Sequence, residues 1–155
     1  MRVLHIASGR YMEARITVLR REELTDTVGK RFDFDWRREL TFDVYKITFI
    51  NDDYILGLIS TQINLGERRF EIRLLELSRE NVGAFKEYDR LAGCLIAFAC
   101  KLSFKEGLDG FVSLIPKTVL ISHYMKKYFF SPMGVQLYVE GEVAVALIME
   151  YLEND

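Results

Sequence analysis

Apolar and polar positions alternate over several short stretches in the first half of the chain, and this period of two predicts β-strands. The stretches are "ARITVLR" (14–20), "VYKITFI" (44–50), "YILGLISTQI" (54–63) and "RRFEIRLLEL" (68–77). The connection "NDD" has hairpin chemistry, so the strands on either side of it should pair antiparallel. Alternation in the last stretch ends at Leu74 and Leu75, which predicts a central strand buried on both faces there.

The region between the first two strands carries weaker signals. "REELTDTVG" (21–29) predicts a short helix that Gly29 stops. "FDFDW" (32–36) alternates aromatic residues with acids, which predicts a strand with Phe32, Phe34 and Trp36 on one face.

The second half begins with a long apolar helix. Residues 91–104 are nearly all apolar, and Gly107 is placed to cap the C-terminus of this helix. "FVSLI" (111–115) follows as a short strand that Pro116 terminates. Strand, loop, helix and strand in this order predict a right-handed β-α-β crossover between two parallel strands.

The chain then continues with a helix, a strand and a helix. "TVLISHYMKKYFF" (118–130) has helical spacing with Lys117 or Thr118 near its start, and "VQLYV" (135–139) and "EVAVALIMEYLE" (142–153) follow. No stretch has the composition of a linker. We therefore predict a single α+β domain over residues 1–155, with a mixed, strongly twisted sheet.

Composition limits which partners and which cellular compartment are compatible with the chain. The net charge is −2, which gives no basic excess to attract nucleic acid or an anionic membrane. Cys94 and Cys100 lie on different faces of one predicted helix and cannot pair, so we expect two buried thiols in a reducing compartment. The first apolar run is too short for a signal core, and none reaches the length of a membrane span. These features predict a cytoplasmic protein.

The order of elements and three local phrases resemble the GNAT superfamily of N-acetyltransferases, in particular a small bacterial branch. The phrases are "LLELSREN", "YDRLAGCLIAFACKLSFKEG" and "HYMKKYFF", and the likeness runs from about Tyr45 to Tyr128. It implies that acetyl-CoA, the co-substrate, lies between two splayed central strands, "RLLEL" and "FVSLI". The pantetheine would then hydrogen-bond to the first strand, near Leu75 and Leu77.

The resemblance also implies that a loop and helix start bind the pyrophosphate, through the pattern Q/R-x-x-G-x-G/A. Free backbone N–H groups and the helix dipole favour an anion at such a place. In the preferred alignment Arg90 stands at the first glycine and Ala92 at the second, and Leu95 packs behind the loop. In the other alignment the pattern is read from Arg90, and Gly93 then fits while Leu95 does not.

The expected cofactor-binding residues are therefore Leu75, Leu77, Arg90, Leu91, Ala92 and Gly93. For Arg90 three interpretations stay open: a contact to a phosphate, a side chain that fills the space of the cofactor, and an exposed arginine without a ligand.

The reaction implied by the family needs a proton acceptor for the amine and a proton donor for the leaving thiolate. The donor is usually a tyrosine followed five and six residues later by Gly-Phe; here Tyr124 takes that place, with Phe129 for the glycine and Phe130 for the phenylalanine. A core tyrosine is the alternative. Glu76 is the candidate that orients water or acts as the base, with an exposed surface glutamate as the alternative. His123 should point away from Tyr124 to the surface.

Two functions remain open. One is acetyl transfer to an amine of a small molecule or a protein, by direct attack on the thioester. The other is a catalytically degenerate GNAT-fold module that binds CoA or a protein, including itself as a homodimer; Arg90, Lys117 and Phe129 favour it. Histidines and cysteines lack the spacing of metal ligands, so we expect no metal. "RREEL", "ERR" and "KK" are expected to be solvated charged faces.

Overall fold

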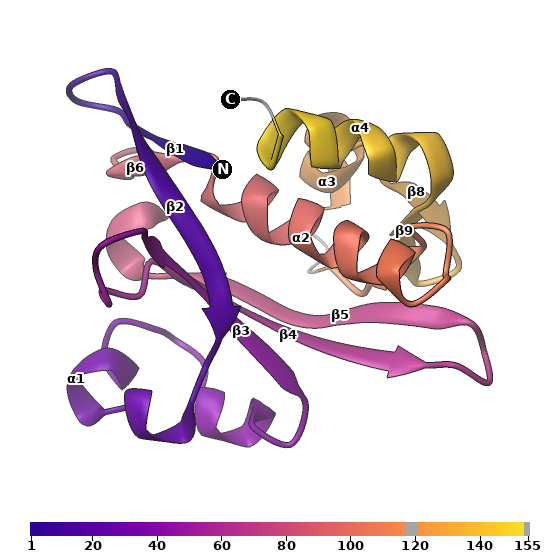
Figure 1. Ribbon diagram of the computed structural model, residues 1–155, viewed down its shortest axis with the longest axis horizontal. Coiled ribbons are helices and arrows are strands. Elements are labelled where there is room, and N and C mark those ends of the chain that lie inside the picture. Colours follow the sequence, from indigo (N-terminus) through magenta and orange to yellow (C-terminus); the bar gives the residue numbers. More distant parts are fainter. Residues whose placement is uncertain (117–120, 154–155) are drawn as a thin grey trace.

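A nine-stranded mixed sheet forms the frame of the computed structural model, which describes residues 1–116 and 121–153 (Figure 1). The strand order within these ranges is β6-β1-β2-β3-β4-β5-β7-β9-β8. The strands are β1 (Arg2–His5), β2 (Arg10–Val18), β3 (Asp43–Phe49), β4 (Gly57–Asn64), β5 (Arg69–Leu77), β6 (Tyr88–Asp89), β7 (Val112–Leu114), β8 (Ser131–Met133) and β9 (Gln136–Val139). The α+β class with a mixed sheet is thereby confirmed.

Strand pairing follows the predicted scheme in its centre. Strands β3, β4 and β5 pair antiparallel in sequence order, and β5 pairs parallel with β7. The connection that joins β5 to β7 contains α2 (Leu91–Lys105), so the expected β-α-β crossover is confirmed. The short strands β1, β6 and β8 were not predicted.

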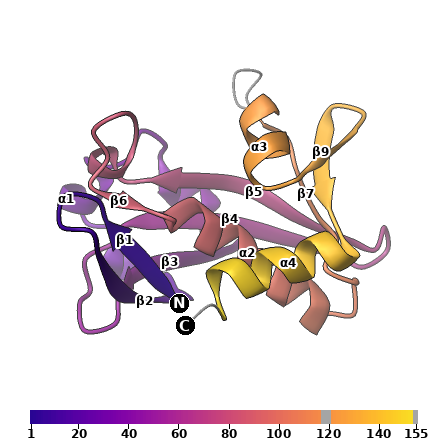
Figure 2. The same ribbon diagram turned by 90° about the horizontal axis from the view of Figure 1, so that it is seen from above.

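Helices lie on both faces of the sheet. Helix α2 and helix α4 (Gly141–Tyr151) pack side by side on one face, as Figures 1 and 2 both show. Helix α1 (Asp26–Gly29) and two 3-10 helices, Arg21–Glu23 and Trp36–Glu39, lie on the other face. Helix α3 (Ile121–Lys127) lies beside β7 and β9 (Figure 2), and a further 3-10 helix spans Arg79–Asn81. None of the described helices is long and apolar enough to span a membrane.

The end of α2 is built as the sequence predicts. Gly107 adopts a φ of 75°, its N–H donates to the carbonyl of Phe104, and the N–H of Leu108 donates to the carbonyl of Ser103. This is the Schellman arrangement, in which a glycine in the left-handed region reverses the chain. The reversal allows the chain to re-enter the sheet as β7.

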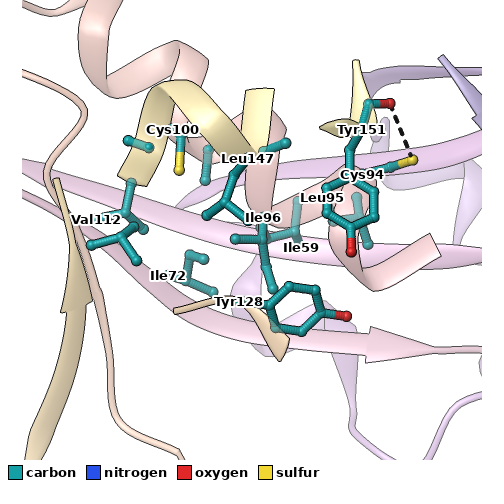
Figure 3. Close-up of a cluster of buried hydrophobic side chains, with 14 of the residues drawn as sticks. Ile59, Ile72, Cys94, Leu95, Ile96, Cys100, Val112, Tyr128, Leu147 and Tyr151 are labelled. Atoms are coloured by element: carbon teal, nitrogen blue, oxygen red, sulfur yellow. Dashed lines mark hydrogen bonds between the residues drawn. The ribbon is translucent and has the colours of Figure 1, made fainter. Parts of the chain in front are cut away.

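The main core lies between α2, α4 and the sheet (Figure 3). Cys94 and Cys100 are fully buried in it as free thiols, and the Cys94 Sγ lies 3.8 Å from the carbonyl oxygen of Tyr151. Burial raises the pKa of each thiol to about 12. Both cysteines are therefore inert core residues at neutral pH.

A second core, under the other face, contains Phe32 and Trp36 and corrects one prediction. Residues 32–35 form no strand, and Trp36 begins a 3-10 helix whose N-cap, Asp35, accepts a hydrogen bond from the N–H of Arg37. Phe32 and Trp36 are buried, whereas Phe34 is 41% exposed. The predicted aromatic strand face was wrong because the backbone of this segment bonds to a side chain, Glu76, and not to a neighbouring strand.

Candidate functional site

The two central parallel strands separate soon after they meet. Strand β7 pairs with β5 only at Glu71 and Ile72, and the next residue, Arg73, is the extra residue of a β-bulge opposite β4. A bulge bends its strand and increases the local twist. The remaining part of β5, residues 74–77, therefore turns away from β7, and no described strand pairs with its edge on that side.

A cleft with a volume of about 770 Å³ lies between the splayed strands. Its walls are β5 from Ile72 to Leu77, the end of β7 with Ile115 and Pro116, the start of α2, and α3. Leu74 and Leu75 are half-buried in this wall. The prediction that they are buried on both faces was wrong, because a strand cannot be covered where its neighbour diverges. The expected cofactor residues Leu75 and Leu77 line the cleft.

The start of α2 forms the end wall of the cleft and has an unusual backbone. Arg90 is the N-cap of α2, with φ 80° and ψ −2°, in the left-handed region that glycine favours. The side chain of Arg90 makes no capping hydrogen bond, so the first-turn amides of α2 receive no cap from it. The conformation fits the alignment that places Arg90 at the first glycine of the phosphate pattern.

The side chain of Arg90 binds the C-terminal helix, α4. Its Nη1 lies 3.0 Å from Oε1 of Glu150, and its Nη2 donates to the Glu150 carbonyl at 2.7 Å. The Nε lies 3.4 Å from the carbonyl oxygen of Arg2, and the guanidinium carbon lies 4.8 Å from the ring centroid of Tyr151. Arg90 thus ties α2 to α4 and β1, which none of the three interpretations from the sequence anticipated.

The three residues that follow Arg90 have different positions. Leu91 is buried and Ala92 half-buried, and both line the cleft. Gly93 does not contribute to the lining; it packs against the ring of Tyr151, where a Cβ would lie 2.2 Å from the Tyr151 Cε1. Packing of α4 against α2 therefore accounts for the glycine at position 93.

The turn before α2 is fixed by a buried polar network. Asn81, 1% exposed, accepts a hydrogen bond from the N–H of Tyr88 and donates to Ser78 Oγ, which in turn donates to the carbonyl of Leu56. Such fully bonded buried groups specify one loop geometry. The sequence analysis did not identify Asn81, because nothing in "SREN" distinguishes it from an exposed turn residue.

Three charged residues meet at the same end of the cleft, and the sequence analysis did not identify them as a group. The Oδ1 of Asp89 accepts from the N–H of Arg90 at 2.8 Å and from Nζ of Lys86 at 2.9 Å, and lies 3.9 Å from Nζ of Lys127. Burial alone would raise the pKa of Asp89, but these hydrogen bonds outweigh it and hold the pKa below its ordinary value. Lys127 belongs to the "KK" pair that was predicted to be a solvated face; it lines the cleft, 39% exposed.

Tyr124 on α3 lines the cleft opposite β5. Its ring contacts those of Tyr128 and Phe130, with centroids 5.9 and 5.7 Å away, and burial raises the pKa of its hydroxyl. Tyr124 therefore stays protonated at neutral pH and can donate a proton.

His123 is exposed, as predicted, but it also lines the same cleft, so the prediction that it does not share a cleft with Tyr124 was wrong. Adjacent helical positions diverge by about 100°, but this cleft is wide enough to include the exposed His123 at its rim. Burial and the nearby charges of Lys127 and Lys86 lower the pKa of His123.

Phe129, at the position of the family's glycine, has a φ of 59° and is 65% exposed. Both glycine positions of the family patterns therefore have the glycine backbone, at Arg90 and at Phe129, although the side chains differ. Lys117 and Thr118, the predicted start of the α3 helix, lie outside the described residues.

Glu76 lies near the end of β5 with both carboxylate oxygens in use. Oε2 accepts from the N–H of Asp33 at 2.6 Å, and Oε1 accepts from the indole N–H of Trp36 at 2.8 Å and the N–H of Phe34 at 3.3 Å. The carboxylate thus anchors the segment 33–36, and Asp33 and Phe34 line the cleft beside Glu76.

Comparison with known proteins finds similarity in structure and not in sequence. No protein-family model and no curated protein matches the chain. A solved structure of a mutant toxin AtaT, bound to acetyl-CoA and the C-terminus of the antitoxin AtaR, is similar with a TM-score of 0.61 and 14% identity, over 88% of this chain and 99% of that one.

Two acetyltransferases show the same likeness. Mutant forms of the spermidine/spermine N-acetyltransferase SpeG from Vibrio cholerae have a TM-score of 0.60 and 13% identity, over 92% of this chain and 98% of theirs. The IAA acetyltransferase from Bacillus cereus has a TM-score of 0.57 and 13% identity, over 83% and 99% of the two chains. The bulged β5, its splay from β7 and these similarities together show that the chain has the fold of the GNAT superfamily.

Proposed function

We propose that the protein transfers an acetyl group from acetyl-CoA to an amine. The observation that carries this proposal is the cleft between β5 and β7, because it joins a free strand edge, a helix start and a protonated tyrosine in one cavity. A pantetheine chain can hydrogen-bond to the edge of β5 near Leu75 and Leu77. Its pyrophosphate then reaches the first turn of α2 at Leu91 and Ala92, where amides favour an anion.

The reaction is a direct attack. The amine nitrogen forms a bond to the thioester carbonyl carbon, the tetrahedral intermediate collapses, and the C–S bond breaks with its electron pair on sulfur. The hydroxyl of Tyr124 gives its proton to the departing thiolate, and water takes the proton that the amine loses. Glu76 acts as a positioning residue that holds the segment 33–36 at the acceptor end of the cleft.

The acceptor is an amine on a small molecule or a protein. Among proteins of similar fold, SpeG is a spermidine/spermine N-acetyltransferase, and AtaT is a toxin that also forms a complex with AtaR and DNA. For this chain the net charge of −2 argues against nucleic acid as a partner. A cytoplasmic location remains a prediction from composition.

A second candidate is a GNAT-fold module that binds CoA, or associates with itself or another protein, without turnover. It is favoured by Arg90 and Phe129, which occupy positions whose backbone suits glycine. In its CoA-binding form this candidate shares the cleft with the proposed enzyme and lacks the acetyl transfer.

One experiment separates the two functions. Isothermal titration with CoA and acetyl-CoA tests the cleft, and binding at one hundred times Kd should stabilise the fold by about 2.7 kcal/mol. Thiol release from acetyl-CoA is then followed with a panel of amines for the wild type and Tyr124→Phe. The proposed enzyme loses turnover in the variant while CoA affinity persists, because the proton is needed only in the transition state. Absence of CoA binding would reject both candidates that use the cofactor.

A further inference from the structure

The phosphate end of the cleft contains a carboxylate where the proposed function places an anion. Asp89 comes from β6, Lys86 from the loop before it, and Lys127 from α3 on the opposite wall. A single oxygen, Oδ1 of Asp89, lies within hydrogen-bonding distance of Lys86 Nζ and of the Arg90 N–H and within 3.9 Å of Lys127 Nζ. Two ammonium groups and a helix-start amide thus converge on one point from three elements.

The surroundings of this point favour an anion beyond Asp89 itself. The nearby Tyr128 and Tyr151 are neutral, because burial raises the pKa of both hydroxyls. Burial and the same two lysines lower the pKa of His123, which favours its neutral form. Arg90 is occupied by Glu150. Among the described residues at this end of the cleft, Lys86 and Lys127 are therefore the cations that can bind a phosphate.

We propose that Lys86 and Lys127 bind the phosphate groups of CoA, and that Asp89 is an internal counter-ion which these phosphates displace. This inference rests on the proposed function and names residues outside the family pattern. In the free protein Asp89 holds both ammonium groups at the cleft and limits their mutual repulsion. A phosphate has more negative charge and more acceptor oxygens than a carboxylate, so it competes for the same donors.

The test is calorimetric titration with three probes: CoA, pantetheine, which lacks phosphate, and inorganic pyrophosphate, which lacks pantetheine. Lys86→Met and Lys127→Met should each weaken CoA and pyrophosphate about tenfold, the scale of one charge-assisted hydrogen bond, and leave pantetheine unchanged. Lys126→Met is the matched control, since Lys126 is an exposed neighbour on α3 that does not line the cleft. Asp89→Asn keeps an acceptor for the Arg90 N–H and should tighten CoA about fivefold.

Each outcome decides the inference. If Lys126→Met and Lys127→Met weaken CoA binding equally, the effect comes from the overall charge of the protein and the inference is wrong. Weaker CoA binding in Asp89→Asn would show that Asp89 supports the site when CoA is bound, and would contradict its displacement by the phosphates. If CoA and pantetheine bind with affinities independent of Lys86 and Lys127, the inference fails and the proposed function stands. If pyrophosphate binds through these lysines but neither CoA nor pantetheine binds, the anion site stands and the proposed function fails.

Discussion

The guanidinium of Arg90 binds Glu150 twice, once at the side-chain carboxylate and once at the backbone carbonyl. The second bond satisfies a carbonyl in the last turn of α4, where a cation also complements the helix dipole. A residue that the sequence predicts at a glycine position of a phosphate-binding loop thus holds the C-terminal helix in place. The strain of a left-handed arginine is offset by these contacts and does not require a bound phosphate.

This arrangement predicts an order of stability. Arg90→Ala should lower the free energy of unfolding by about 1 to 3 kcal/mol, because it removes hydrogen bonds of a charged group. Arg90→Gly loses the same bonds but relieves the left-handed backbone, so it should be more stable than Arg90→Ala by about 1 kcal/mol. Urea denaturation of the three proteins measures this order. If Arg90→Ala is as stable as the wild type, the hydrogen bonds between Arg90 and Glu150 contribute nothing to the free energy of unfolding.

The pattern of apolar and polar residues was sufficient to predict the central strands and helix, and insufficient to predict the side-chain contacts of the site. Strand β5, helix α2 and strand β7 follow from alternation and apolar runs, since the core dictates those residues. The side chain of Arg90 could not be placed, because its partner Glu150 is 60 positions away and no local rule links them. Asp89 and Lys127 were not identified for the same reason, because their proximity depends on where α3 lies across the cleft from β6.

The left-handed position of Phe129 predicts a stabilising substitution. Its side chain is 65% exposed, so little packing is lost when it is removed. Phe129→Gly should raise the free energy of unfolding by about 0.5 to 1 kcal/mol, the relief of the backbone minus the entropy of a glycine in the unfolded chain. Phe129→Ala is the control, since it removes the ring and keeps the Cβ. If both variants change stability equally, the backbone at this position is not strained.

The contact between Gly93 and Tyr151 predicts a destabilising substitution with a specific rescue. An added Cβ would overlap the ring, so Gly93→Ala should cost about 1 to 3 kcal/mol of stability as α4 is pushed away. Tyr151→Leu in the same chain should recover part of this loss, because a smaller side chain admits the methyl group. Thermal unfolding of the two single variants and the double variant measures the coupling. Additive effects would mean that α2 and α4 do not meet through this pair.

The hydrogen bonds from Trp36 and the Asp33 N–H to Glu76 give the last prediction, which separates an anchor from a general base. Trp36 is the sole tryptophan of the chain and is 3% exposed, so its fluorescence reports on this one contact. Glu76→Ala should lower stability by about 1 to 3 kcal/mol and shift the emission to longer wavelength, as the segment 33–36 loosens and water reaches the indole.

Trp36→Phe removes the same indole bond from the other side, so its cost and that of Glu76→Ala should be less than additive in the double variant. Glu71→Ala, on the same strand but without a bond to this segment, is the matched control and should leave the emission unchanged. A catalytic base would behave differently: Glu76→Ala would abolish turnover with emission and stability as in the wild type. Because Glu76 already accepts three hydrogen bonds, two of them from backbone amides, we expect the fluorescence change to accompany any loss of activity.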